Sequence, residues 1–374
     1  MTPSRRILPW AGIVVVFVAL VIDLFHRPEK IGIDFHTYEA AAMIGMQHGW
    51  SHLYDQAAVA ELQGRLDPSA WTQPFLSPPT VAWLAAALTP FPYAVAYGIW
   101  AVVGFAAFAV ALAWSAESRG FMRWIGAGAA LAPWWVIHAV NLGQVVPLVA
   151  AGVVIGWRLL RDDHDVAAGL VLAAIFLKPN TAILLPIALL VAGRYRAFGV
   201  WIAAGALLGV IAALTMGPEA ISTYIAQLRA PLPAGADALT LKGAIGADGA
   251  VGVALRVLIA AAVLVTAFRL RNGPGLVMPI GIVGSLLVSP YLHASDLCLL
   301  AAAAWMVWEE RPAVAWRAPL ALGWVLASPF LFVNGLSPAL NRWPLLELVL
   351  LGAMIAAAWW PLTGQADSRR RAPA

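Results

Sequence analysis

Seven of the ionisable residues in or beside the apolar stretches of this sequence are candidates for chemistry, because a charge there costs free energy unless it is paired or used. They are Asp34, Glu39, Lys178, Arg256, His293, Asp296 and Glu347. A carboxylate at a membrane edge, such as Asp34, can act as a general base that accepts the proton of a sugar hydroxyl. An ammonium or imidazolium, such as Lys178 or His293, can bind a phosphate. These residue types together suit chemistry on the head group of a lipid.

Asp34 follows the first apolar stretch of the chain and opens a predicted helix that also carries Tyr38. Two roles compete for it. An aspartate at a helix start commonly caps the free backbone N–H groups, which would make Asp34 structural. A carboxylate at this depth can equally serve as the general base of a transfer reaction.

The second candidate is the Lys178-Pro179-Asn180 segment, which interrupts an apolar run. Proline breaks the helix there and frees backbone groups, which protein or a wet cavity must satisfy. Lys178 is then either an anchor that extends to the membrane surface beside a kink, or an ammonium that binds phosphate.

Two further polar turns interrupt apolar segments. Tyr291, His293 and Asp296 follow Pro290 at a predicted membrane boundary, where they form either a head-group site or a turn in which Asp296 caps the next helix. The turn that ends at Gln144 allows the same two interpretations.

The composition restricts the class of protein that can carry these residues. Of the 374 residues, 62% are hydrophobic and 11% are charged, whereas soluble domains carry about 25% charge. The sequence therefore predicts an all-α polytopic membrane protein. The net charge is +4, and the basic residues lie mostly at the ends of apolar runs. This distribution does not indicate nucleic-acid binding. The single Cys298 excludes an internal disulfide and a cysteine metal site, and we expect no metal and no cofactor.

The apolar runs predict about twelve transmembrane helices. Arg5 and Arg6 precede the first of them, which has no cleavage pattern and is interpreted as an uncleaved helix that starts in the cytoplasm. The basic tail of the chain favours a cytoplasmic C-terminus. The predicted spans are residues 7–25, 78–90, 93–114, 124–140, 145–160, 166–192, 197–216, 250–268, 276–292, 296–308, 320–333 and 345–361.

Two topologies remain open between residues 78 and 196. In one, the segment around Lys178 is a re-entrant or broken pair; in the other, 166–192 is one long kinked helix. Both place residues 26–77 and 217–247 outside the cell (inner) membrane, on the periplasmic or external side. The chain is predicted to be a single membrane domain over residues 1–374.

The two external loops are predicted to differ in character. The 26–77 loop contains two short helices, 34–48 and 51–66, and Tyr38, Ala42 and Met46 form a one-sided face suited to lying along the membrane surface. The 217–247 loop is rich in Ala, Pro and Gly, which predicts a flexible connection.

Taken in order, several short motifs resemble the polyprenyl-phosphate-sugar-dependent glycosyltransferases of family 87 over roughly residues 30–310. The motifs are Asp34-Phe35 with Tyr38, Ala41 and Gly49; Leu53-Tyr54-Asp55; Pro78-Pro79; Gly143-Gln144; Lys178-Pro179; and Ser289-Pro290 with His293 and Asp296.

This resemblance implies a C-type glycosyltransferase (GT-C) fold with its site at the external membrane face. It implies a hexosyltransferase that moves a sugar, typically mannose, from a polyprenyl phosphate to a lipid-linked or glycan acceptor. The motif that carries the expected general base falls on Asp34. We expect His293 and Lys178 to bind the donor phosphate, and the residues expected to bind substrate are Tyr38, Gln144, Asn180, Tyr291 and Asp296.

Two other functions are compatible with the sequence. A transporter or flippase of a lipid-linked saccharide would have two related halves and charges along a central path. A ligase of related architecture would use a diphosphate-linked donor.

Overall fold

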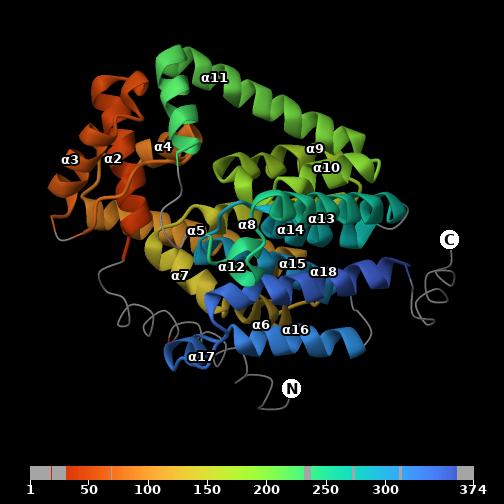
Figure 1. The fold of residues 1–374 in the computed structure, drawn as a ribbon. Coiled ribbons are helices and arrows are strands. Elements are labelled where there is room, and N and C mark those ends of the chain that lie inside the picture. The colour runs from red at the N-terminus through yellow and green to blue at the C-terminus, as the bar shows by residue number, and fades with distance from the viewer. Residues whose placement is uncertain are drawn as a thin grey trace.

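A computed structural model of the chain describes residues 31–68, 70–230, 237–271, 274–310 and 314–359, together with Val18. The described residues form helices and connecting turns and contain no strand, which confirms the all-α class (Figure 1). Apart from Val18, the predicted first transmembrane helix lies outside the described residues.

The α-helices follow one another with short connections. Their bounds are α2 Ile33–His48, α3 Gln56–Leu66, α4 Pro79–Ala86, α5 Tyr93–Ser115, α6 Met122–Leu131, α7 Trp134–Leu142, α8 Val146–Arg161, α9 Asp165–Val171, α10 Leu184–Val191, α11 Tyr195–Leu228, α12 Leu241–Ile245, α13 Gly249–Arg269, α14 Val277–Val288, α15 Cys298–Glu309, α16 Val314–Leu326, α17 Pro329–Val333 and α18 Trp343–Trp359. Short 3₁₀ segments are η2 Trp50–His52, η3 Leu172–Leu177, η4 Pro179–Thr181, η5 Pro274–Leu276, η6 Ala294–Leu297 and η7 Leu340–Arg342.

Four helical stretches of the described chain are long and apolar enough to cross a membrane. They are 93–115, 195–228, 249–269 and 340–359, and α6 with α7 makes a fifth if that pair, bent by 75°, counts as one span. Other predicted spans form shorter helices: α8 has 16 residues and α15 has 12. At 1.5 Å per residue, both fall short of a hydrocarbon core of about 30 Å. The prediction of about twelve transmembrane helices is therefore not confirmed.

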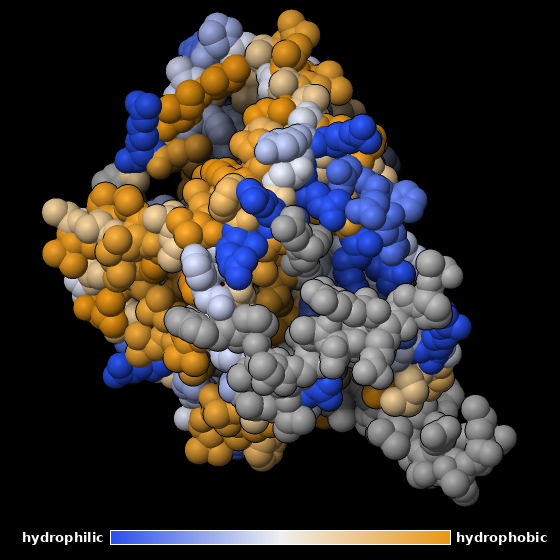
Figure 2. Space-filling view, turned by 90° about the vertical axis from the view of Figure 1, so that its right-hand side faces the viewer, coloured by the Kyte–Doolittle hydropathy of each residue, from blue (hydrophilic) through white to orange (hydrophobic). Residues whose placement is uncertain are grey.

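The outer surface of the longest helices is apolar. Leu214 of α11 is 81% exposed and Leu258 of α13 is 66% exposed, which is a burial pattern suited to lipid contact. Figure 2 shows the molecule from the side on which α11 begins in Figure 1, with hydrophobic surface gathered on the left and hydrophilic side chains across the middle and right.

The segment around Lys178 is broken and folds back on itself. Helix α9 and η3 lead to Lys178, and η4 and α10 lead away from it. Arg194, just beyond α10, forms ion pairs with Asp163 at 2.9 Å and Asp165 at 3.2 Å, at the start of α9. Both ends of the segment therefore meet, with Lys178 at the turn. The structure has the broken pair and not the single kinked helix.

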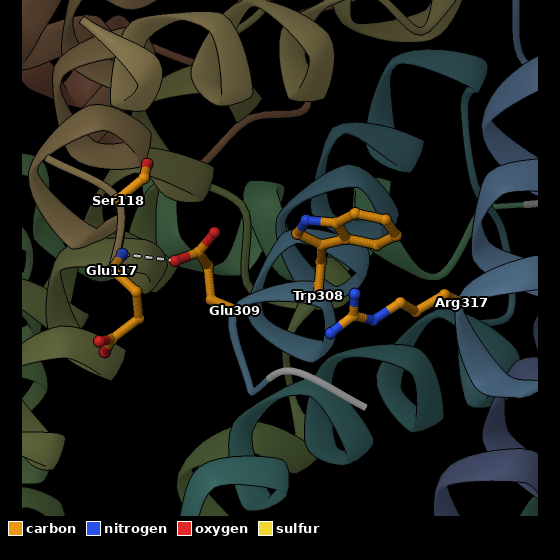
Figure 3. Close-up of a pocket in the computed structure, with 5 residues that line it drawn as sticks. All are labelled: Glu117, Ser118, Trp308, Glu309 and Arg317. Carbon is orange, nitrogen blue, oxygen red and sulfur yellow. Dashed lines mark hydrogen bonds between the residues drawn. The ribbon is translucent and has the colours of Figure 1, made fainter. Parts of the chain in front are cut away.

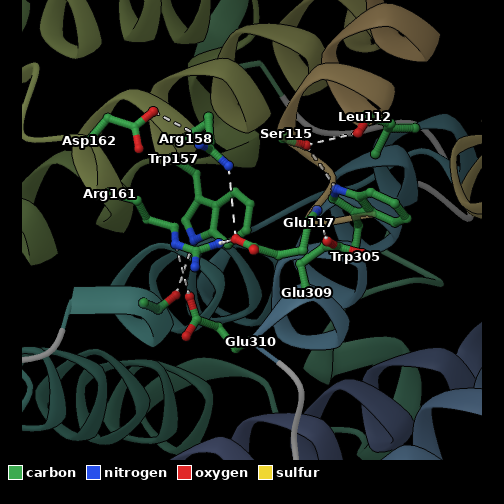
Figure 4. A network of polar contacts seen from close by, with 11 residues as sticks. Leu112, Ser115, Glu117, Trp157, Arg158, Arg161, Asp162, Trp305, Glu309 and Glu310 are labelled. Atoms are coloured by element: carbon green, nitrogen blue, oxygen red, sulfur yellow. Dashed lines mark hydrogen bonds and ion pairs between the residues drawn. The ribbon is translucent and has the colours of Figure 1, made fainter. Parts of the chain in front are cut away.

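A second polar network holds together helix ends on the far side of the bundle from Lys178. Arg161 at the end of α8 contacts Glu117 at 3.0 Å and Glu310 at 3.5 Å, and Arg158 contacts Asp162 at 2.9 Å (Figure 4). A cavity of about 380 Å³ beside it is lined by Glu117, Ser118, Trp308, Glu309 and Arg317 (Figure 3). We call the helix ends that carry Arg158, Arg161 and the nearby Arg194 the basic end of the bundle.

The first predicted surface helix is in fact buried. Helix α2 matches the predicted 34–48 helix within a residue, but it packs between α3, α4 and α5 (Figure 1). Tyr38 and Ala42 are buried, while Met46 is 62% exposed. The one-sided face expected from the pattern is absent, because small residues such as Ala40 and Ala41 let neighbours approach on both faces. The position of α2 at the membrane surface stays a prediction.

The predicted flexible connection over 217–247 is also wrong in its first part. Helix α11 bends at Gly217, where φ is 76°, and continues to Leu228. Pro218 then stands in the first turn of a new helical stretch, where its missing N–H costs little. That stretch docks beside η2 and the turn that follows it: Tyr224 stacks on Tyr54 with ring centroids 4.5 Å apart.

Candidate active site

The start of α2 fixes the position of Asp34. Gly32 takes the N-cap position with a left-handed φ of 68°, and its N–H donates to the Asn141 carbonyl at 2.7 Å. The Tyr93 hydroxyl donates to the Gly32 carbonyl at 3.1 Å. Asp34 follows in the first turn, so the N-cap role considered for it belongs to Gly32.

Gln144 connects three of the predicted site residues. Its side-chain oxygen Oε1 accepts hydrogen bonds from Tyr38 Oη at 3.1 Å and from Lys178 Nζ at 3.2 Å. Its side chain also hydrogen-bonds the carboxyl group of Asp34. A base and a hydroxyl from α2 and an ammonium from the turn between η3 and η4 therefore meet at one amide.

The turn before Gln144 requires glycine. Gly143 ends α7 in the left-handed conformation, with φ of 71°, and a Cβ there would lie 2.6 Å from the Cβ of Phe35. The indole of Trp100 donates to the Gly143 carbonyl at 2.8 Å. This close approach of the α7–α8 turn to α2 places Gln144 beside Asp34.

Lys178 and Asp296 form a buried ion pair. Lys178 Nζ lies 2.6 Å from Asp296 Oδ1, and their side chains are 12% and 0% exposed. Asp296 Oδ2 accepts a hydrogen bond from the backbone N–H of His293 at 2.8 Å. Asp296 thus closes the capping box of η6, whereas the N-cap of α15 is Leu297, and the same carboxylate also holds the ammonium.

The His293 ring completes the open side of the cluster. The ring is exposed and lies edge-on to Tyr291, with centroids 5.7 Å apart. Asp34 is half-buried. Burial raises the pKa of Asp34, while the charges of Lys178 and His293 oppose that rise. A carboxylate with a raised pKa is a stronger base than one in water, which suits proton acceptance.

One predicted residue stands apart, and one was missed. Asn180 is half-buried, and its side-chain nitrogen has no hydrogen-bond partner in the described chain; no contact ties it to the cluster. His138 on α7 is buried and interacts electrostatically with Asp34. In the sequence, His138 could have been singled out because it lies one helical turn before the Asn141–Gln144 turn.

Over the described ranges, no three His, Cys, Asp or Glu side chains are placed to hold a metal.

The other three charged candidates lie elsewhere. Glu39 is buried on α2, with Oε2 unpartnered in the described chain, and Arg256 lies on α13. Glu347 is buried on α18. No contact in the described structure joins any of the three to the Gln144 cluster.

Comparison with known proteins adds one match. No match was found among the curated proteins or among the solved structures. A family model described as glycosyltransferase family 87 matches residues 75–290, a stretch that contains Gln144 and Lys178 and ends just before His293. The matched stretch is more than half of the chain, so this membrane protein belongs to glycosyltransferase family 87.

Proposed function

We propose that the protein transfers a hexose, mannose in the first instance, from a polyprenyl phosphate to a lipid-linked or glycan acceptor, with inversion at the anomeric carbon. The site lies at the external face of the cell (inner) membrane. The observation that carries the proposal is the meeting of Asp34 and Lys178 at Gln144, since it brings a base and a cation to the same side chain.

The reaction is a single displacement. Asp34 accepts the proton of an acceptor hydroxyl, and that oxygen forms a bond to the anomeric carbon as the bond from this carbon to the phosphate oxygen breaks. The electron pair of the broken bond leaves with polyprenyl phosphate. Attack opposite to the leaving group inverts the anomeric configuration, as in other displacements with one base.

The leaving phosphate develops negative charge, which cations held in place before the reaction stabilise best. Lys178 is held by Asp296 and Gln144, so its ammonium needs no reorganisation to meet a phosphate. The exposed imidazole of His293 is the second donor on the same side. Tyr38, Gln144 and Tyr291 shape the space between base and cations, and Asp296 acts through Lys178.

A lipid-linked donor fits the surroundings of the site. The chain has long apolar helices for a hydrocarbon tail to lie against. A nucleotide sugar would need a cytoplasmic site, whereas the basic end, rich in Arg158, Arg161 and Arg194, is the end that the positive-inside rule assigns to the cytoplasm. The Asp34 cluster lies at the other end.

The transporter alternative receives less support. Its central charged path has no counterpart in the described structure, where Asp34, Lys178, His293 and Asp296 gather at one end of the bundle. Membership of a glycosyltransferase family also favours the transferase.

The test uses the purified protein in detergent, with no second compartment. Polyprenyl-phosphate mannose, the matching nucleotide sugar and a diphosphate-linked glycan are each supplied with membrane-lipid acceptor extract, and the products are analysed by mass spectrometry and NMR. We expect product from the monophosphate donor alone, with inverted anomeric configuration. Product only from another donor, or retained configuration, contradicts the proposal.

A further inference from the structure

A large apolar cavity lies away from the Asp34 cluster, between α6, α15, α16 and α18. Its volume is about 1040 Å³, at the upper end of the range for small-molecule sites. Figure 1 shows α6, α16 and α18 side by side in the lower part of the molecule. Six of its lining residues are tryptophans: Trp135, Trp305, Trp308, Trp316, Trp324 and Trp343.

Three buried polar side chains line this cavity without a hydrogen-bond partner in the described part of the chain. In Glu347 both carboxyl oxygens are unpartnered, and in Trp135 and Trp343 the indole N–H groups are unpartnered. Glu347 and Trp343 are 1% exposed and Trp135 is 3% exposed. Each such group costs free energy unless something supplies the missing partner.

The three groups are close neighbours. The rings of Trp135 and Trp343 meet edge to face, with centroids 4.6 Å apart. Glu347 follows Trp343 by one turn of α18, so both side chains lie on one face of that helix. No lysine, arginine or histidine in the described chain pairs with Glu347.

A hydroxyl group matches this set. It has one O–H donor for the carboxyl of Glu347 and two lone pairs that can accept from the indoles of Trp135 and Trp343. A phosphate or carboxylate head group would instead meet an acidic residue with no cation beside it, which disfavours an anion. Apart from Glu310, which forms an ion pair with Arg161, the remaining lining is hydrocarbon and aromatic, which suits a long chain.

The surroundings of the cavity favour a lipid as the source of that hydroxyl. Helix α18 lies within the membrane-spanning stretch 340–359, and α6 belongs to the bent pair that counts as a fifth span. We propose that the cavity binds an uncharged lipid with a long hydrocarbon chain and a hydroxyl group, at a site distinct from the one that carries Asp34.

The tryptophan lining provides the measurement. Bromine atoms quench indole emission on contact, so a dibrominated C18 fatty alcohol can be titrated into the protein in phosphatidylcholine nanodiscs. The matched dibrominated fatty acid, at a pH where it is ionised, is the control ligand. We expect saturable quenching by the alcohol at one equivalent, with an apparent Kd about tenfold or more below that of the acid, which is the scale of one hydrogen bond to a charged group.

Variants assign the difference to Glu347. Glu347→Leu should raise the Kd of the alcohol about tenfold or more, whereas Glu347→Gln, which keeps an acceptor, should stay within about threefold. Glu61→Leu, at a carboxylate that is 73% exposed on α3, should change nothing. Equal quenching by alcohol and acid in the wild type, or an unchanged Kd in Glu347→Leu, overturns the proposal. Displacement of the alcohol by polyprenyl phosphate at an equal concentration also overturns it, since the cavity would then belong to the donor.

Discussion

The ammonium of Lys178 lies 2.6 Å from the carboxylate of Asp296, and the other oxygen of that carboxylate is bound to the backbone N–H of His293. Asp296 thus links the two residues proposed to meet the donor phosphate. The pair is buried, so neither charge can be removed without leaving the other unmatched in a low-dielectric site.

Removing one partner of the Lys178–Asp296 pair should therefore destabilise the protein more than removing both. We expect Asp296→Leu to lower the free energy of unfolding by about 3–5 kcal/mol, and the double variant Lys178→Met with Asp296→Leu to recover most of that loss. Thermal unfolding in detergent measures both effects.

The activity of the same double variant separates two roles of Lys178. If Lys178 stabilises the leaving phosphate, the double variant should fold and remain inactive with any donor. Wild-type turnover by a folded double variant would show that the ion pair is only structural.

Gln144 should act by positioning. Gln144→Leu keeps the approximate volume but removes the acceptor shared by Tyr38 and Lys178, so we expect kcat to fall about 10–100-fold, the scale of a small misplacement of reacting groups. Tyr38→Phe removes one of the two bonds and should cost less. Steady-state transfer kinetics give both values, and a larger loss in Tyr38→Phe than in Gln144→Leu would contradict the role assigned to Gln144.

Gly143 should tolerate no side chain. In Gly143→Ala, the added Cβ meets Phe35 and the left-handed backbone is strained, so we expect a loss of about 1–3 kcal/mol in stability together with reduced activity. Gly64→Ala is the matched control, since nothing lies within 4 Å of its added Cβ and α3 gains a better helix former. Equal melting temperatures of the two variants would exclude a tight α2–α7 contact.

The raised pKa of Glu39 should make the stability of the protein depend on pH. Burial raises its pKa from the usual 4.5 to about 7. Between these values the folded state binds more protons than the unfolded state, so this residue lowers stability as pH rises through the window. Glu39→Gln removes the titration, and its melting temperature relative to wild type should rise from pH about 5 to pH about 8. A difference that does not vary with pH would show that Glu39 ionises normally.

Much of the local structure followed from the sequence, for physical reasons that are visible in particular elements. The predicted helices 34–48 and 51–66 end where α2 and α3 end, directly before Gly49 and before Asp67-Pro68, and glycine and proline are common local signals for such ends. The break at Lys178-Pro179 was predicted for the same reason.

Tertiary relationships were harder to predict. The spacing of Tyr38, Ala42 and Met46 indicated a helix with one apolar face, but α2 is covered on several sides by elements that a local pattern cannot reveal. The apolar runs also did not distinguish a helix that crosses the membrane from a shorter apolar helix such as α15. The link from Asp34 through Gln144 to Lys178 joins three distant segments, so each motif could be singled out but their contact could not be predicted.

The general base is the central claim, and Asp34→Asn tests it most directly. Asparagine keeps the size of the side chain and a hydrogen bond to Gln144 but cannot accept the proton, and loss of a general base costs about 10²–10⁴ in rate. Asp55→Asn is the control, because Asp55 caps α3 and asparagine caps equally well. The measurement is the single-turnover rate of sugar transfer from polyprenyl-phosphate mannose, with melting temperatures to confirm folding. We predict wild-type transfer by Asp55→Asn and a fall of at least about a hundredfold in a folded Asp34→Asn; a folded Asp34→Asn that keeps more than about a tenth of the wild-type rate would contradict the account.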